Sequence, residues 1–442
     1  MENAKQKTAR FLALHGCAPE TVDLDRAMAD FVQEMEAGLA GKPSSLKMIT
    51  TYVSPDGEIP VDEPVIVIDA GGTNFRVALV RFDANRAPVV ENLEVHPMPG
   101  TQGELDSDAF YATMASYLLP VADRAHRIGF CFSFPVEMQP DKDGRLIQFN
   151  KEVKVRGAVG GFVGASLLKA LREAGVKGDK TVVILNDTVA TLLGGKAAFP
   201  DRRFDGTIGY ILGTGTNSAY AEHNARLVKS PTLLRKAGTT LVNMESGGYG
   251  GHPQSEIDRA YDATTTNPGV HTFEKMISGA YQGGLLLHTM AAAAKDGLFS
   301  AKTAKAFAGL SSLSSKEIDL FCFYPFETRN VLAGCIGSGQ TESEREDRQI
   351  LYHLIDAQFE RAARLVAVNL AAAIVHTGRG TDPCLPVCVS AEGTTFYKSK
   401  LFRGKLDHYV QTFLNGKLGV YCDFVQADKA TLVGTAIAGL IG

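Results

Sequence analysis

Residues 65–80 read VIVIDAGGTNFRVALV, in which two β-rich apolar runs flank a Gly-Gly-Thr-Asn turn. This pattern predicts a strand, a tight glycine turn and a second strand. Glycine lets the backbone approach a ligand closely, and successive N–H groups in such a turn can bind an anion. Asp69 lies at the mouth of the turn, where its charge would repel a phosphate unless a divalent cation lay between them. The alternative is an ordinary hairpin whose Asp caps the turn.

A second copy of the pattern occurs at residues 208–220, which read IGYILGTGTNSAY. Gly72-Thr73-Asn74 aligns with Gly215-Thr216-Asn217, an offset of 143 residues (215 − 72). Leu212 then takes the place of Asp69. The repeat favours a ligand site, because two facing glycine turns can hold a polyphosphate from both sides. Only the first copy would bring an acid directed at a metal ion.

The composition is that of a globular protein and excludes several classes of function. The 442 residues suffice for two domains, and 45% hydrophobic with 21% charged residues is ordinary. The formal net charge of −4, from 45 basic and 49 acidic side chains, gives no reason to expect a nucleic-acid partner. The chain has no long apolar span and no apolar secretion signal at its start, so we expect a cytoplasmic protein without a membrane segment.

The cysteines predict neither disulfides nor a metal centre. Seven cysteines in a chain of this length suit a reducing compartment. Cys384 and Cys388 form a C-x₃-C spacing without a second ligand pair nearby, which argues against structural zinc.

The polar triplet Asn186-Asp187-Thr188 follows the short apolar run 181–185 and precedes a helical pattern that starts at Val189. An amphipathic pattern at 160–175 comes before that run, so the order is helix and then buried strand, which suggests a parallel crossover. Polar residues at the carboxyl end of a buried strand are typical of a site in α/β folds. The alternative is that Asp187 is simply the N-cap of the helix.

Two glutamates lie next to turn-forming segments further along the chain. Glu245 precedes Ser-Gly-Gly-Tyr-Gly, and Glu274 follows Asn-Pro-Gly-Val-His-Thr-Phe. Glu274 is equally compatible with a solvated first helical turn. Further helices are expected from the spacing of apolar residues at 22–40, 107–125, 346–376 and 430–441.

Several well-known motifs are absent from the sequence. It contains no G-x-x-x-x-G-K-[ST], no H-E-x-x-H and no G-x-S-x-G. A dinucleotide fingerprint must open a helix, whereas residues after Gly215 continue with strand-like alternation, so a Rossmann site is not expected there.

Taken in order, these segments resemble the hexokinases, within the superfamily of sugar kinases, actin and Hsp70-like ATPases. Each segment is a weak or moderate signal alone, but seven in the family's order are specific. The matching segments are Asp69 to Val77, Gly129 to Pro135 with its Phe-Ser-Phe-Pro core, Leu146 to Lys151, Asn186-Asp187-Thr188, Gly213 to Asn217, Asn243-Met244-Glu245, and Asn267-Pro268-Gly269 through Ile277.

The resemblance implies an α/β, two-lobed actin-like ATPase (ribonuclease H-like) fold with a central cleft. It implies a small lobe of residues 60–187 plus 427–442 and a large lobe of residues 1–59 plus 188–426. The implied reaction is ATP-dependent phosphorylation of a hexose, with glucose expected, at its 6-hydroxyl, the first step of glycolysis. The partners would be the hexose and Mg-ATP, and a homodimer is left open. A kinase of the same fold with another sugar or donor, or a non-catalytic sugar sensor, remains the alternative.

The resemblance also assigns roles to individual residues. Asp187 would be the base that accepts the proton of the 6-hydroxyl, and Lys151 a catalytic cation near the transferred phosphoryl group. Asp69 would hold Mg²⁺, and through it the phosphates of ATP. The hexose hydroxyls would be held by Ser133, Asn150, Lys151, Asn186, Asp187, Asn217, Glu245 and Glu274. The remaining ATP contacts would come from Gly71, Gly72, Thr73, Asn74, Arg76, Gly213 and Thr214.

The sequence departs from the family pattern at three places. The usual Trp-Thr-Lys is Phe149-Asn150-Lys151, and the usual Glu-Trp-Gly-Ala-Phe-Gly is residues 245–250, Glu-Ser-Gly-Gly-Tyr-Gly. Both changes leave the sugar selectivity open. The glycine-rich segment expected before the last helix reads Gln-Ala-Asp-Lys-Ala-Thr at 426–431, which leaves the adenine pocket unassigned. The chain has no tryptophan, so no intrinsic tryptophan fluorescence change on sugar binding is expected.

Overall fold

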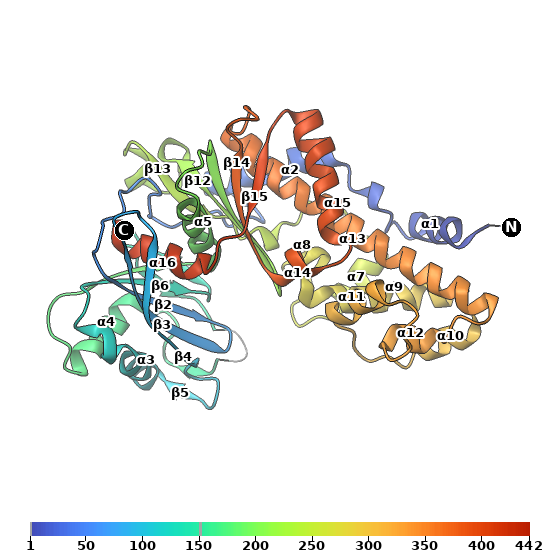
Figure 1. The fold of residues 1–442 in the computed structure, drawn as a ribbon, viewed down its shortest axis with the longest axis horizontal. Coiled ribbons are helices and arrows are strands. Elements are labelled where there is room, and N and C mark those ends of the chain that lie inside the picture. The colour runs from blue at the N-terminus through green and yellow to red at the C-terminus, as the bar shows by residue number, and fades with distance from the viewer. Residues whose placement is uncertain (1, 150–152) are drawn as a thin grey trace.

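A computed structural model describes residues 2–149 and 153–442. The chain forms two α/β lobes, each built around one larger β-sheet (Figure 1). The five-stranded sheet of the small lobe has the order β10-β6-β2-β3-β4, and the six-stranded sheet of the large lobe has the order β1-β13-β12-β11-β14-β15. The small-lobe strands are β2 (Val65–Gly71), β3 (Asn74–Phe82), β4 (Pro88–Pro97), β6 (Arg127–Phe132) and β10 (Thr181–Leu185). The large-lobe strands are β1 (Ile49–Thr50), β11 (Gly206–Leu212), β12 (Thr216–His223), β13 (Thr239–Asn243), β14 (Val387–Glu392) and β15 (Cys422–Val425).

Both predicted glycine-turn hairpins are present. The first hairpin is the antiparallel pair β2–β3, in which Gly71 lies opposite Asn74. The second hairpin is the antiparallel pair β11–β12, in which Leu212 lies opposite Thr216. The duplicated sequence pattern therefore forms one hairpin in each lobe.

The central strand of the small lobe explains why residues 65–68 are apolar without alternation. Successive side chains of a strand point to opposite faces, and here both faces are covered. Ile66 and Ile68 belong to the core that includes α3 (Ser107–Ala122) and α4 (Val163–Glu173). Val65 and Val67 belong to the core formed with α5 (Asp187–Ala198) and α16 (Ala430–Ile441).

Helices α5 and α16 lie between the two sheets (Figure 1). The backbones of the two helices pack in direct contact, as shown by Gly434, where a Cβ would overlap the carbonyl of Ala190. Helix α5 contacts β11, β12 and β14, whereas α16 contacts β2 and β6. This pair of helices joins the lobes, and the boundary expected at residue 187 falls where α5 begins. The assignment of residues to the two lobes stays a prediction.

Most of the large lobe is helical. Helix α13 (Glu342–Thr377) runs through its core, and its buried face packs against α2 (Leu24–Leu39) and α1 (Ala4–Leu14). The expected helices at 22–40, 107–125, 160–175, 346–376 and 430–441 correspond to α2, α3, α4, α13 and α16. The remaining helices are α6 (Pro231–Leu234), α7 (Glu256–Asp262), α8 (Thr272–Ile277), α9 (Gly279–Lys295), α10 (Ala301–Phe307), α11 (Ser315–Phe323), α12 (Val331–Ile336), α14 (Thr394–Lys398), α15 (Phe402–Tyr409) and a π-helix at Val410–Leu418. The remaining strands are β5 (Leu105–Asp106), β7 (Val136–Met138), β8 (Gly144–Leu146) and β9 (Val155–Arg156).

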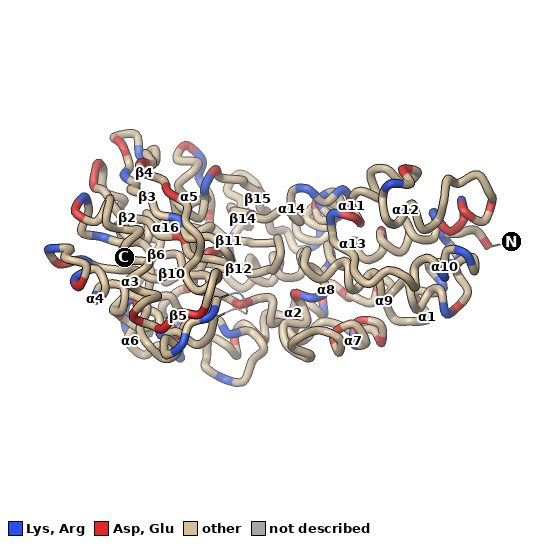
Figure 2. The backbone as a smooth tube through the Cα atoms, turned by 90° about the horizontal axis from the view of Figure 1, so that it is seen from below, with Lys and Arg blue, Asp and Glu red and all other residues tan. Residues whose placement is uncertain are grey.

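Acidic and basic residues are interspersed over the described backbone, and no single basic stripe is seen (Figure 2). Even the 36-residue α13 lacks a stretch apolar enough to span a membrane, and the same is true of every other helix in the described ranges.

Candidate functional site

Three neighbouring parallel strands bring the predicted residues of the small lobe to one edge of its sheet. In the register of β2, β6 and β10, Asp69, Cys131 and Leu185 lie side by side. Asp69 therefore lies level with the carboxyl ends of β6 and β10. Ser133 and Asp187 follow directly at those two ends, where α/β folds bind ligands. The expectation that a polar triplet after residue 185 marks this edge agrees with the geometry.

The first hairpin presents an open glycine turn at this edge. Gly72 has φ +57°, and a Cβ at this position would have no neighbour within 4 Å, so the turn faces free space. Thr73 and Asn74 are exposed beside it. Ser133 donates its backbone N–H to the Ala70 carbonyl at 3.0 Å, which ties the end of β6 to the turn.

Asp69 is the only acidic residue of the two hairpin turns, and only 13% of its side chain is exposed. Its Oδ2 accepts a hydrogen bond from Arg76 Nη1 at 2.7 Å. Mg²⁺ is commonly held by one or two carboxylates together with phosphate oxygens of the substrate, so a single Asp at a phosphate-binding turn fits this ion. No cluster of three or more potential metal ligands occurs in the described part of the chain.

Asp187 is the first residue of α5, and the N-cap is Asn186, whose side chain accepts from the Thr188 N–H at 2.8 Å. The cap interpretation of Asp187 is therefore wrong, and its carboxylate is free for another role. Thr188 Oγ1 donates to Asp187 Oδ1 at 3.2 Å. Desolvation by the surrounding protein, and to a smaller extent the charges of Asp69 and Glu245, raise the pKa of Asp187 to about 6 against the opposing Thr188 hydrogen bonds.

A cluster of three asparagines, which we call the amide cluster (Asn186, Asn217 and Asn243), connects the lobes beside Asp187. Asn217 Nδ2 donates to Asn243 Oδ1 at 2.7 Å and lies 3.4 Å from Asn186 Oδ1. Asn243 Nδ2 donates to Glu245 Oε1 at 2.9 Å. The predicted sugar-binding residues Asn186, Asn217 and Glu245 are thus brought together around Asn243. Asn243 belongs to one of the quoted motifs, but no role was predicted for it.

Glu245 has a left-handed backbone, with φ 55°, which is uncommon for a non-glycine residue and is often found at functional sites. Lys47 Nζ lies 3.9 Å from its Oε2 and was not predicted as a site residue. Nothing in the local sequence around Lys47 marks it, because the contact joins segments about two hundred residues apart.

A cavity of about 170 Å³, which we call the cleft cavity, lies between the lobes at this point. Ser133 and Asn186 line it from the small-lobe edge, and Lys47, Asn243 and Glu245 line it from the large lobe. Its other walls are apolar side chains such as Phe132, Phe134 and Ile147. The cavity therefore combines hydrogen-bonding groups on several sides with a small volume, which suits a small polyol.

The turn of the second hairpin is anchored to the large lobe. Gly213 O accepts from Gly279 N at 2.8 Å and from Thr395 Oγ1 at 3.0 Å. Glu274 Oε2 accepts from Thr216 N at 2.9 Å, so Glu274 is not a freely solvated residue of a helical turn. Burial raises the pKa of Glu274, although the Thr216 N–H opposes the shift.

A larger cavity of about 460 Å³, which we call the hairpin-side cavity, lies next to this anchored turn. Thr395 connects the two, because it lines the cavity and donates to Gly213. The sequence did not predict this cavity, and none of residues 426–431 is among those lining it. They are Ser315, Lys316, Asp319, Leu320, Phe323, Phe359, Thr394, Thr395, Lys398 and Ser399.

Two of the predicted residues, Asn150 and Lys151, lie outside the described residues. Their neighbour Phe149 packs against Phe134 and Phe110, with ring centroids 5.3 Å apart in both pairs. Phe134 in turn lines the cleft cavity.

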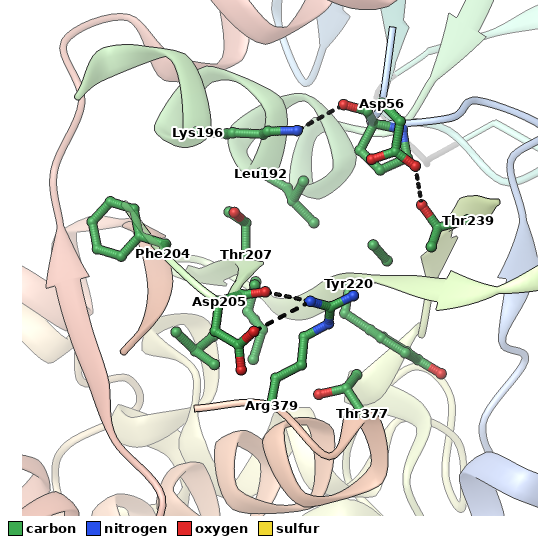
Figure 3. Close-up of a pocket in the computed structure, with 15 residues that line it drawn as sticks. Asp56, Leu192, Lys196, Phe204, Asp205, Thr207, Tyr220, Thr239, Thr377 and Arg379 are labelled. Carbon is green, nitrogen blue, oxygen red and sulfur yellow. Dashed lines mark hydrogen bonds and ion pairs between the residues drawn. The ribbon is translucent and has the colours of Figure 1, made fainter. Parts of the chain in front are cut away.

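A separate cavity of about 160 Å³ lies near the amino-terminal end of β11 and is drawn in Figure 3. Its charged side chains have polar partners within it: Lys196 donates to the Pro55 carbonyl at 2.8 Å, Asp56 accepts from Thr239, and Arg379 contacts Asp205. None of the predicted site residues lines it.

Comparison with known proteins places these features in a family. Two hexokinase family models match the chain, one at residues 13–197 and the other at residues 207–441. Hexokinase-5 of Oryza sativa subsp. japonica is 32% identical over 381 residues, which cover 81% of this chain and 73% of that protein. Hexokinase-7 of the same plant is 32% identical over 82% of this chain and 81% of that protein. A solved structure described as hexokinase from Schistosoma mansoni complexed with glucose matches with a TM-score of 0.76 at 21% identity, covering 99% of this chain and 100% of that one. This structural match confirms the two-lobed α/β fold.

Proposed function

The chain belongs to the hexokinase family and transfers a phosphoryl group from ATP to a hexose, and we propose that its substrate is glucose, phosphorylated at the 6-hydroxyl. The observation that carries the proposal is the position of Asp187. Its carboxylate, with the pKa raised to about 6, lies at the sheet edge shared by Asp69 and Ser133 and next to the amide cluster. The product would be glucose 6-phosphate, made in the first step of glycolysis.

The cleft cavity is the proposed hexose site. A hexose carries hydroxyls that each donate and accept, so its site needs carboxylates, amides and hydroxyls. Ser133, Asn186 and Glu245 supply these types in its lining. Asn217 is bound to the lining residue Asn243, and Glu274 holds the backbone of the second hairpin at Thr216. Asn243 and Lys47 would fix Glu245, because they contact its two carboxylate oxygens. A site of this kind rejects ligands that leave its polar groups unpaired.

The two hairpins are the proposed phosphate-binding elements, with ATP lying between them. The first hairpin would contribute Gly71, Gly72, Thr73 and Asn74, and the second Gly213 and Thr214. Asp69 would hold Mg²⁺, which supplies charge neutralisation of the phosphates when bound. We assign the adenosine to the hairpin-side cavity, which begins at Thr395 next to the second turn.

In this proposal Asp187 orients the 6-hydroxyl and receives its proton at a carboxylate oxygen as the new O–P bond forms. Phosphoryl transfer depends mainly on positioning and charge stabilisation, so proton acceptance comes late and a weak base suffices. Arg76 binds Asp69 at 2.7 Å and would share this carboxylate with the metal ion. Closure of the cleft around the hexose would exclude water that could otherwise accept the phosphoryl group.

The test is a coupled assay with Mg-ATP across glucose, mannose, fructose and a non-sugar polyol, for the wild type and for Asp187→Asn. We expect glucose turnover, and a loss of at least about a hundredfold in kcat for the variant. The matched control is Asp23→Asn, the N-cap of α2, because asparagine caps a helix as well as aspartate does. Near wild-type turnover of Asp187→Asn would contradict its role, and glucose binding by calorimetry without turnover would favour a sugar sensor.

A further inference from the structure

The amino-terminal helix and the start of α13 enclose a groove far from the cleft. Helix α1 packs against α13 at the end of the molecule opposite the C-terminus (Figure 1). The groove has a volume of about 590 Å³, larger than either cavity of the proposed active site. We call it the basic groove. It is lined by Asn3, Ala4, Lys5, Pro325, Phe326, Arg345, Arg348, Gln349, Tyr352 and His353.

The basic groove has an excess of positive charge. Lys5, Arg345 and Arg348 line it, and no acidic side chain of the described residues does. Arg345 donates only to backbone carbonyls, those of Gly339 and Gln340. Since the protein as a whole carries a net charge of −4, this local excess is not a reflection of composition.

The acidic residues nearest in sequence are already paired elsewhere. Glu344 binds Lys302 at 2.7 Å, and Glu346 binds Lys7 at 2.5 Å. Asp347 accepts from the backbone and hydroxyl of Ser300. Glu346 and Asp347 are therefore engaged by other partners, whereas the charge of Glu344 acts on Arg348 as well as on Lys302.

Arg348 is a buried cation whose hydrogen bonds, among the described residues, go to neutral groups. The residue is only 4% exposed, yet its guanidinium donates to backbone carbonyls, those of Pro325 and Gly337, and to no carboxylate of the described chain. Its Nη1 has no hydrogen-bond partner. Burial lowers the pKa of this guanidinium, and the charge of Glu344 opposes the shift only in part. Buried charges are normally paired, so an anion in the groove would compensate this one.

Aromatic groups accompany the cations. The Phe326 ring is 62% exposed and has the Arg348 guanidinium 4.3 Å from its centroid. Tyr352 lines the groove one turn beyond Arg348 on the same face of α13. Cations interleaved with aromatic rings are suited to a ligand that combines phosphate with a flat ring.

We propose that the basic groove binds a nucleoside phosphate at a second site, separate from the cleft. Its phosphates lie against Lys5 and Arg345, within the field of Arg348, and its base lies against Phe326 or Tyr352. This site does not depend on the phosphoryl-transfer reaction, so a nucleotide in the groove is a regulatory ligand rather than a substrate.

The test uses the absence of tryptophan from the chain. Phe326→Trp introduces a single tryptophan at an exposed position in the groove, and Tyr352→Trp provides a second reporter if the first fails to fold. Titration with ADP without metal should change the emission to saturation, with weaker binding of adenosine. Adding Arg345→Gln to the reporter should weaken the apparent ADP affinity by about tenfold.

The matched control adds Arg10→Gln to the same reporter. Arg10 lies on α1, at the same end of the molecule as the groove. The substitution removes one positive charge there, but Arg10 is exposed and does not line the groove. Unchanged emission with millimolar ADP would overturn the proposal, as would equal weakening by Arg10→Gln and Arg345→Gln. Equal affinity for ADP and inorganic pyrophosphate would overturn the assignment of a nucleoside. The kinase assay of the wild type tests the cleft independently of these outcomes.

Discussion

The two glycine-turn hairpins share a sequence pattern but differ in what holds them. The turn of the first hairpin is exposed, has Gly72 in a left-handed conformation and carries Asp69, paired with Arg76. The turn of the second hairpin is bound by Gly279, Thr395 and Glu274 and carries Leu212 in place of the acid. One copy is thus open and charged, and the other is fixed and neutral. The two copies of the pattern therefore form one exposed turn and one turn that its surroundings hold in place.

The largest effect of breaking this asymmetry is expected from Asp69→Asn. If Asp69 holds Mg²⁺ as proposed, its loss should lower kcat by about 10²–10³-fold, as for loss of a charge-stabilising group in other active sites. Steady-state rates over a range of Mg²⁺ concentrations would measure it. Glu94→Gln on the neighbouring strand β4 is the control for charge, since Glu94 is exposed and contacts only His96. Equal Mg²⁺ dependence of Asp69→Asn and the wild type would remove Asp69 from the metal site.

The aligned asparagines provide a second comparison. Asn217 donates to Asn243, and its Oδ1 accepts from the backbone of Ser218 and Ser246, whereas Asn74 in the first hairpin is exposed. Asn217→Ala should cost about 2–3 kcal/mol of unfolding free energy, because it leaves buried partners unpaired. Asn74→Ala should change stability by no more than about 0.5 kcal/mol. Urea denaturation of both variants would measure the difference, and similar losses would mean that the two turns are equally supported.

The sequence predicted the two hairpins well because each rests on local signals: a continuous apolar run, a glycine turn and a second apolar run. It also placed Asp187 at the carboxyl end of a buried strand, since strand and helix signals adjoin there. It left open whether Asp187 caps the helix, and the structure shows that Asn186 does, because both types cap helices and only the backbone geometry distinguishes them.

Other parts of the site depend on contacts that no local pattern records. Asn243 joins the amide cluster because β13 pairs with β12, which places it opposite Ala219, two residues from Asn217. The hairpin-side cavity is built from α11, α14 and residues after them, which are about eighty residues apart in the chain. Lys47 reaches Glu245 across a gap of 198 residues (245 − 47). The cytoplasmic location expected from the sequence stays a prediction.

The third prediction concerns the pKa of Asp187, which the charge of Asp69 in the first hairpin helps to raise. A raised pKa means that the folded protein disfavours the ionised carboxylate, so stability falls as pH rises from about 4, the ordinary value, to about 6. Asp187→Asn should therefore stabilise the protein by about 1–2 kcal/mol at pH 8 and have little effect at pH 4. Chemical denaturation at both pH values would measure this. Asp69→Asn removes one cause of the shift, so the gain from adding Asp187→Asn should be smaller in that background.

The smallest expected effects on stability come from replacing a turn glycine in each hairpin. Gly72 is needed for its left-handed backbone, and Gly215 for the close approach of Glu274. Gly72→Ala should cost about 1 kcal/mol, since alanine is strained at a φ of +57° although nothing lies within 4 Å of its Cβ. Gly215→Ala has no such strain, but its Cβ would lie 2.6 Å from Glu274 Oε2, so its cost arises from displacing that carboxylate. Each substitution should therefore be combined with Glu274→Ala and the unfolding free energies compared. The Gly72 effect should add to that of Glu274→Ala, whereas the Gly215 effect should shrink when the carboxylate is absent. Additivity at both positions would mean that Glu274 does not support the second turn and that the two hairpins differ only in Asp69.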